Sequence, residues 1–109
     1  MSSFYNFEID YTEDILKIAA QNLQKRRLEK GLSRNILSEM SGVPAPTIAK
    51  FEQKHTVSLS SYVSLAKALG YAKDVKELLS KPLYNTMKEL DMINKNKGRK
   101  RGSRNETNK

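Results

Sequence analysis

Side chains suited to catalysis or metal binding are few in this sequence. It holds one histidine, His55, and no cysteine, so no cluster with metal-ligand spacing can be assembled. The serines near it have no histidine base that would activate a nucleophile; they are Ser58, Ser60, Ser61 and Ser64. The acids show no paired-carboxylate spacing, and the glycines are isolated rather than gathered in a phosphate-binding loop. We therefore expect no catalytic residue, no metal and no cofactor, and the sequence argues against an enzyme.

The charged residues point instead to a polyanionic partner. The net charge is +8; residues 1–14 contribute four acids and no base, and residues 95–109 contribute seven bases and one acid. A mildly basic body with a strongly basic tail suits binding to nucleic acid. A positive surface that only keeps the protein soluble is the alternative that charge alone leaves open.

Length and composition favour one small domain with flexible ends. The chain has 109 residues, of which 38% are hydrophobic, and its mean hydropathy is −0.67, which allows a modest core. No apolar run is long enough for a membrane span, and the acidic N-terminus is unlike a signal peptide. The absence of cysteine is compatible with a reducing cytoplasm, where we expect the protein to act.

Apolar residues recur at helical spacing, and no segment has the convincing two-residue period of a strand. We expect helices over residues 13–30, 34–40, 46–53 and 73–79, a helix that opens at Ser58 or Ser60 and stops at Gly70, and a weaker one over 86–94. The residues expected to face inward are Ile15, Ile18, Ala19, Leu23, Leu37, Met40, Val43, Ile48, Phe51, Leu59, Val63, Leu65, Ala66 and Leu69. The fold class is therefore all-α.

The chain divides by composition into four segments. Residues 1–12 form an aromatic and acidic arm, which is either extended on a surface or a frayed end. Residues 13–80 form the helical domain, and residues 81–94 a linker with a short helix. Residues 95–109 contain no apolar side chain and are expected to be disordered when free.

Residues 34–53 have the spacing of a helix-turn-helix. Leu37 and Met40 precede a turn at Gly42, and Ile48 and Phe51 follow it, so that these apolar side chains would form one buried set. Together with RRLEKGLS before the motif and SLSSYVSLAKALG after it, roughly residues 14–80 resemble the XRE family of phage-repressor and Cro-like regulators. The resemblance implies a five-helix lambda-repressor-like domain that binds double-stranded DNA.

The resemblance also implies roles for individual residues. Arg34 stands where the family usually has glutamine and would contact a phosphate. Arg27 and Glu52 match a structural ion pair between the first and third helices. The positions that face base edges in the family are Ala45, Pro46, Thr47 and Lys50. The loop that touches the DNA backbone holds Lys54, His55 and Thr56.

The prolines Pro44 and Pro46 change what the recognition helix can read without abolishing it. The first N–H groups of a helix have no intrahelical acceptor, so a proline there loses no helical hydrogen bond. Pro46 disfavours helical geometry at Ala45, which predicts a helix that begins at Pro46. Ala45 and Pro46 offer only apolar contacts, and directional reading would fall on Thr47 and Lys50, with DNA shape supplementing this thin code.

We expect a homodimer on an inverted-repeat operator, because one such domain reads few bases. Apolar residues beyond the needs of one core face would form the dimer contact; they are Val75, Leu78, Leu79, Leu83 and Tyr84. The alternative is that these residues close the core of the monomer.

The segment SKPLYNTMKELDMINKNKGRKRG, residues 80–102, loosely resembles HipB-type antitoxins. This resemblance implies a repressor of its own operon that also binds a HipA-like kinase toxin; the aromatic N-terminal arm departs from it. Two alternatives stay open, a phage-type repressor without a toxin partner and a protein-interaction module that holds a toxin or kinase with little DNA binding. The basic tail would bind either DNA phosphates, which is its simpler use, or a protein.

Overall fold

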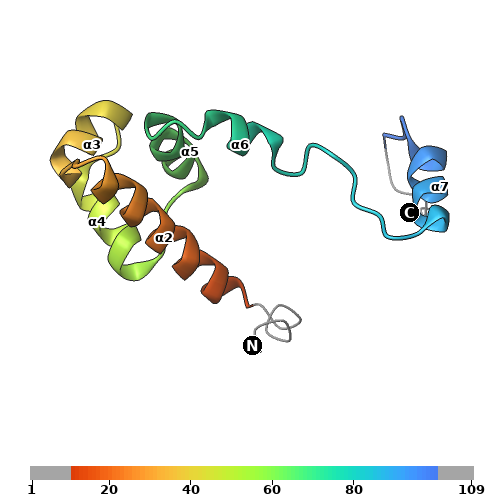
Figure 1. Ribbon diagram of the computed structural model, residues 1–109, viewed down its shortest axis with the longest axis horizontal. Helices are drawn as coiled ribbons and strands as arrows, with labels where there is room; N and C mark the ends of the chain where they lie inside the picture. The colour runs from red at the N-terminus through yellow and green to blue at the C-terminus, as the bar shows by residue number, and fades with distance from the viewer. Residues whose placement is uncertain (1–10, 101–109) are drawn as a thin grey trace. The chain divides into compact units, whose positions relative to one another are not determined.

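The structure, a computed structural model, describes residues 11–100 and shows six helices and no strand within them (Figure 1). The helices are α2 (Thr12–Glu29), α3 (Arg34–Ser41), α4 (Ala45–Lys54), α5 (Leu59–Ala68), α6 (Ala72–Glu77) and α7 (Met87–Asn96). The predicted all-α class is confirmed, and the helix ends differ by one or two residues from those expected. Residues 1–10 of the predicted arm and residues 101–109 of the predicted tail lie outside the described residues.

Local side-chain chemistry explains where several helices begin and end. The Ser33 Oγ accepts a hydrogen bond from the Ile36 N–H at 3.1 Å and caps α3, as the Ser58 Oγ does for α5 with the Ser61 N–H at 3.1 Å. Gly42 ends α3 with a φ of 80°, a left-handed conformation that glycine adopts without steric cost. These signals are readable from the sequence because each involves neighbours along the chain.

Helix α4 begins one residue earlier than predicted. Its first helical residue is Ala45, and Pro44 is the N-cap with a φ of −58° and a ψ of 141°. The Pro44 carbonyl accepts hydrogen bonds from the N–H groups of Thr47 at 2.9 Å and Ile48 at 3.1 Å. Pro46 therefore lies in the first turn, where its missing N–H costs no helical hydrogen bond.

The described residues fall into two units, which divide after Lys76. In the first unit, α4 packs against α2 and α3, and α3 packs against α5. In the second unit, α7 begins with a reciprocal cap: the Thr86 Oγ1 accepts from the Glu89 N–H at 3.1 Å, and the Glu89 Oε1 accepts from the Asn85 N–H at 2.6 Å. The predicted boundaries of the four segments stay a prediction.

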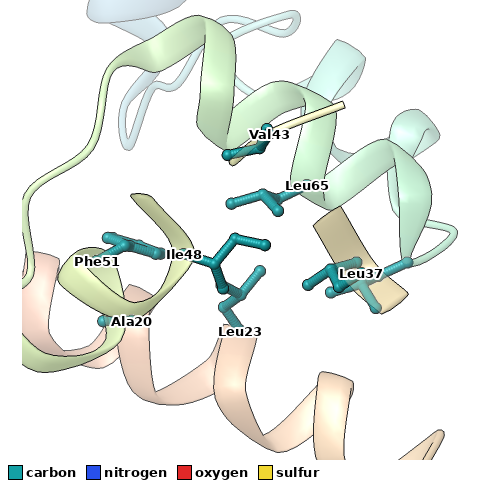
Figure 2. Packing of buried hydrophobic residues seen from close by; sticks show 8 residues of the cluster. Ala20, Leu23, Leu37, Val43, Ile48, Phe51 and Leu65 are labelled. Atoms are coloured by element: carbon teal, nitrogen blue, oxygen red, sulfur yellow. The ribbon is translucent and has the colours of Figure 1, made fainter. Parts of the chain in front are cut away.

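One hydrophobic cluster holds the first unit together (Figure 2). Its members are Ala20, Leu23, Leu37, Val43, Ile48, Phe51, Leu65 and Leu69. The ring of Phe51 meets that of Tyr62 edge-to-face, with centroids 5.7 Å apart and planes at 76°. The cluster therefore joins α2, α3, α4 and α5, and the predicted set Leu37, Val43, Ile48 and Phe51 lies inside it.

Four residues predicted to face inward are exposed instead. The exposed fractions are 54% for Ile15, 53% for Ile18, 51% for Met40 and 77% for Leu59. The buried residues of α2 begin at Ala20, so the first turns of this helix extend beyond the neighbours that could cover them. Leu59 is the first residue of α5 and precedes that helix's buried residues. The spacing of the apolar residues correctly indicated helices, but it does not show how far the neighbouring helices extend to cover them.

Candidate nucleic-acid interface

Helix α4 presents one buried face and one exposed face. Ile48 and Phe51 are fully buried in the cluster, whereas Pro46, Lys50 and Gln53 are exposed. These three exposed residues share the outward face because an α-helix has about 3.6 residues per turn. Within the described residues, α4 thus offers a side-chain surface of its own to a partner.

The four residues predicted to face base edges occupy different parts of this surface. Pro46 and Lys50 are exposed, while Ala45 and Thr47 are half-buried and border the outward face on opposite sides. Gln53 was missed in the sequence, although it lies three residues after Lys50 and the helical period alone could have identified it. Its amide can donate and accept hydrogen bonds.

The residues predicted to contact the DNA backbone lie at the C-terminal end of α4 and immediately after it. Lys54 is the last residue of α4 and is exposed, His55 is half-buried, and Thr56 is exposed. His55 has a φ of 67°, and its N–H donates to the Phe51 carbonyl at 2.8 Å. A left-handed residue at this place ends the helix and turns the chain, so His55 sets the direction in which Thr56 leaves α4.

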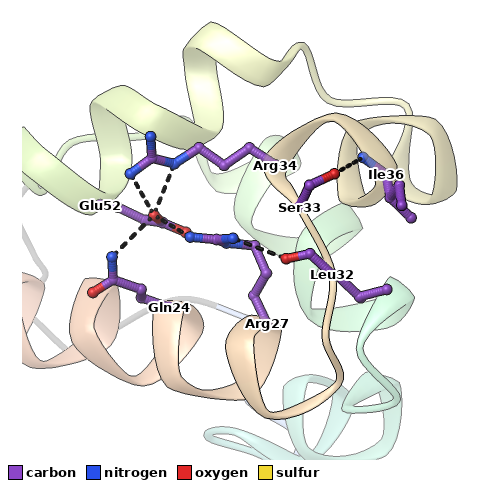
Figure 3. A network of polar contacts seen from close by, with 7 residues as sticks. All are labelled: Gln24, Arg27, Leu32, Ser33, Arg34, Ile36 and Glu52. Carbon is purple, nitrogen blue, oxygen red and sulfur yellow. Dashed lines mark hydrogen bonds and ion pairs between the residues drawn. The ribbon is translucent and has the colours of Figure 1, made fainter.

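On the inner side of α4 lies an ion-pair network centred on Glu52 (Figure 3). The Glu52 side chain is 1% exposed and that of Arg27 is 7% exposed. The Arg27 Nε donates to the Glu52 Oε2 at 2.8 Å, and the Arg27 Nη2 donates to the Glu52 Oε1 at 2.9 Å. This fork-to-carboxylate geometry is the strong form of an ion pair, and it joins α2 to α4.

Two further residues reach the same carboxylate. The Arg34 Nε donates to the Glu52 Oε1 at 3.0 Å, and the Gln24 Nε2 lies 3.4 Å from that oxygen. Sequence reasoning did not place Arg34 on Glu52, since the partner of a residue at the start of α3 depends on how the helices pack. Gln24 precedes Arg27 by three residues, so the two share a face of α2, and that spacing was a usable signal.

The residues predicted to form a dimer contact fall on both sides of the boundary between the two units. Val75 is in α6 and half-buried, and the others follow α6. The exposed fractions are 75% for Leu78, 93% for Leu79, 94% for Leu83 and 46% for Tyr84.

No three side chains among histidines and carboxylates at residues 11–100 gather as a metal site. Within the same range, every helix is too short or too polar to cross a lipid bilayer.

Comparison with known proteins agrees with the geometry of α3 and α4. A family model described as helix-turn-helix matches residues 23–75, which include both helices and the ion-pair network. No curated protein matched the chain, and no solved structure did.

Replacing Arg27 by alanine tests the network. We expect Arg27→Ala to lower the free energy of unfolding by ~3–5 kcal/mol, because it leaves the Glu52 charge buried without its main partner. Urea unfolding followed by circular dichroism measures the loss. The matched control is Arg26→Ala, which removes a surface pair with Glu29 and should change stability by at most ~1 kcal/mol. Equal losses in the two variants would contradict the assignment.

Proposed function

We propose that the chain is a DNA-binding transcription regulator, and specifically a repressor that reads its operator through the exposed face of α4; the helix-turn-helix match over residues 23–75 and the resemblance to the XRE family support this. The observation that carries the proposal is that Pro46, Lys50 and Gln53 project outward while Ile48 and Phe51 fix the helix from behind. A rigidly held helix with free side chains can enter a major groove.

Few side chains on the exposed face of α4 can form directional hydrogen bonds to bases. Ala45 and Pro46 offer apolar contact, for instance to thymine methyl groups. The Lys50 ammonium suits the N7 and O6 acceptors of guanine, and the hydroxyl of Thr47 and the amide of Gln53 add hydrogen-bonding groups. With so few directional contacts, the deformability of the duplex carries part of the specificity.

Sequence-independent contacts hold the helix in place. Lys54 ends α4, His55 and Thr56 follow it, and we assign these three residues to the DNA backbone together with Arg34. Phosphate contacts of this kind fix the register of the protein on the duplex and make binding dependent on salt.

The protein acts as a homodimer on an inverted repeat, with Val75, Leu78, Leu79, Leu83 and Tyr84 at the contact. Two features support this. The leucines are largely exposed in the single chain, and Leu79 has a φ of 65°, a left-handed conformation that costs a non-glycine residue ~1–2 kcal/mol. Burial of an exposed leucine against a second copy offsets such a cost.

The finer proposal is that the chain is the antitoxin of a HipBA-like system and binds a HipA-like kinase. The resemblance of residues 80–102 supports it, as does the exposed apolar character of that segment: Leu83 and Met87 are 94% and 68% exposed. Such a segment suits burial against a partner protein.

Selection from a pool of randomised duplexes tests the reading of bases. The unchanged protein should enrich an inverted repeat, and Lys50→Ala should lose preference at one or two base pairs of each half-site, by ~1–3 kcal/mol for each. Lys17→Ala removes the same charge from an exposed position on α2 and should keep the preference. If Lys50→Ala weakens binding equally for all duplex sequences, the Lys50 side chain contacts only phosphate. Failure of the unchanged protein to bind any duplex at low salt would end the proposal.

Substitution of Leu79 tests the dimer. Leu79→Gly should stabilise the isolated chain by ~1 kcal/mol, because glycine adopts positive φ freely. It should also weaken dimerisation ~10-fold or more, since a buried leucine contributes ~1.5–3 kcal/mol. Sedimentation equilibrium measures the dissociation constant. The control Leu28→Ala truncates a leucine that is 58% exposed on α2 and should leave the constant unchanged. Undiminished dimerisation of Leu79→Gly would refute this contact.

Copurification tests the antitoxin role. The tagged chain, expressed with a HipA-like kinase encoded beside it, should retain the kinase, and Met87→Ser, which changes an exposed residue outside the proposed dimer contact, should release the kinase while DNA binding persists. Absence of such a kinase from the purified complex would remove the antitoxin proposal and leave the repressor.

A further inference from the structure

Three charged side chains around α4 carry one surplus positive charge. Glu52 is the sole carboxylate within ion-pair distance of Arg27 and Arg34 among the described residues. Each nitrogen of Arg27 already makes a hydrogen bond, since its Nε and Nη2 donate to Glu52 and its Nη1 donates to the Leu32 carbonyl at 2.9 Å, and the side chain is only 7% exposed. The surplus charge is therefore available only through Arg34.

The guanidinium of Arg34 is held by one edge and open at the other. Its Nε and Nη2 both lie 3.0 Å from the Glu52 Oε1. Its Nη1 has no hydrogen-bond partner among residues 11–100, and Figure 3 shows this nitrogen pointing away from Glu52. The side chain is 34% exposed, so the open edge is accessible to a ligand.

The surroundings of Arg34 admit an anion. A shallow surface hollow beside it is lined by Arg27, Ser33, Arg34 and Asn35, none of which carries a negative charge. The hydroxyl of Ser33 already accepts from the Ile36 N–H, but the amide of Asn35 is exposed and able to donate.

Arg34 is not required for the Glu52 carboxylate to be paired. The Glu52 Oε1 receives Arg27, Arg34 and the weaker contact from Gln24, whereas the Oε2 receives Arg27 alone. If Arg34 is replaced, both oxygens keep their bonds to Arg27, and the link between α2 and α4 persists. The main effect of this contact is therefore that Glu52 orients the Arg34 guanidinium, and Arg34 contributes little to stability.

We propose that Glu52 is a positioning residue that holds the Arg34 guanidinium so that its Nη1 edge binds one phosphate of the DNA backbone. This deepens the proposed function and rests on it. A guanidinium has separate edges, so one can bind a carboxylate while another binds a phosphate. A lysine has a single charged nitrogen, which would be drawn to Glu52 and could not span both groups in the same way. The site therefore selects arginine for its shape as well as its charge.

The test is Arg34→Lys in the full chain, bound to a labelled duplex of arbitrary sequence over a series of salt concentrations and followed by fluorescence anisotropy. We expect Arg34→Lys and Arg34→Gln to weaken binding by about the same factor, ~10-fold, which is the usual contribution of one hydrogen bond to a charged group. The slope of log K against log salt should fall by ~0.9 in both variants, as for the loss of one phosphate contact. Urea unfolding should show little change in either.

The control is Arg26→Lys, the same substitution at a surface pair whose side chains are 40% and 54% exposed, and it should bind as the unchanged protein does. Wild-type affinity and slope in Arg34→Lys, with weakened Arg34→Gln, would show that charge alone matters and overturn the positioning role. A loss of binding that only follows a loss of stability would also overturn it. Absence of duplex binding by the unchanged protein would refute the proposed function itself, so the two failures are distinguishable.

Discussion

The buried carboxylate of Glu52 is the constraint on which the arrangement of the DNA-binding helices depends. An isolated charge taken out of water costs several kcal/mol, so Glu52 can occupy its place, 1% exposed, only if cations face it. Arg27 faces it from α2 and Arg34 from α3, while Glu52 itself belongs to α4. The hydrophobic cluster provides most of the burial but is tolerant of small shifts in direction. The directional hydrogen bonds between Arg27 and Glu52 fix how α2 and α4 are turned toward each other, and the same carboxylate orients Arg34 of α3.

The helices of this protein were predictable because their signals are local. Ser33, Gly42 and Ser58 act on neighbours a few residues away, and the apolar period shows which side chains share a face. The period does not show how far a facing helix extends, and for that reason Ile15 and Ile18 were wrongly expected to be buried. Burial is a property of two elements, whereas periodicity describes one.

The candidate interface was predictable to the extent that it follows from α4 alone. The exposure of Lys50 and the burial of Phe51 follow from helical spacing once the core face is known. The pairing of Arg27 with Glu52 came from family resemblance and not from spacing. The sharing of Glu52 by Arg34 could not be read at all, because the two residues are 18 positions apart and meet only through the packing of α3 on α4.

Helix α7 has a consequence for how the second unit meets any other molecule. A ten-residue helix is marginal in water by itself, because nucleation fixes several dihedral angles for each early hydrogen bond. The Glu89 N–H donates to the Thr86 Oγ1 and the Glu89 carboxylate accepts from the Asn85 N–H, and these two bonds bias those first angles. A molecule that captures this segment thus encounters a helix whose starting residue is already chosen. Less conformational entropy is lost on binding, and the residues that share one face of α7 are determined before the partner makes contact.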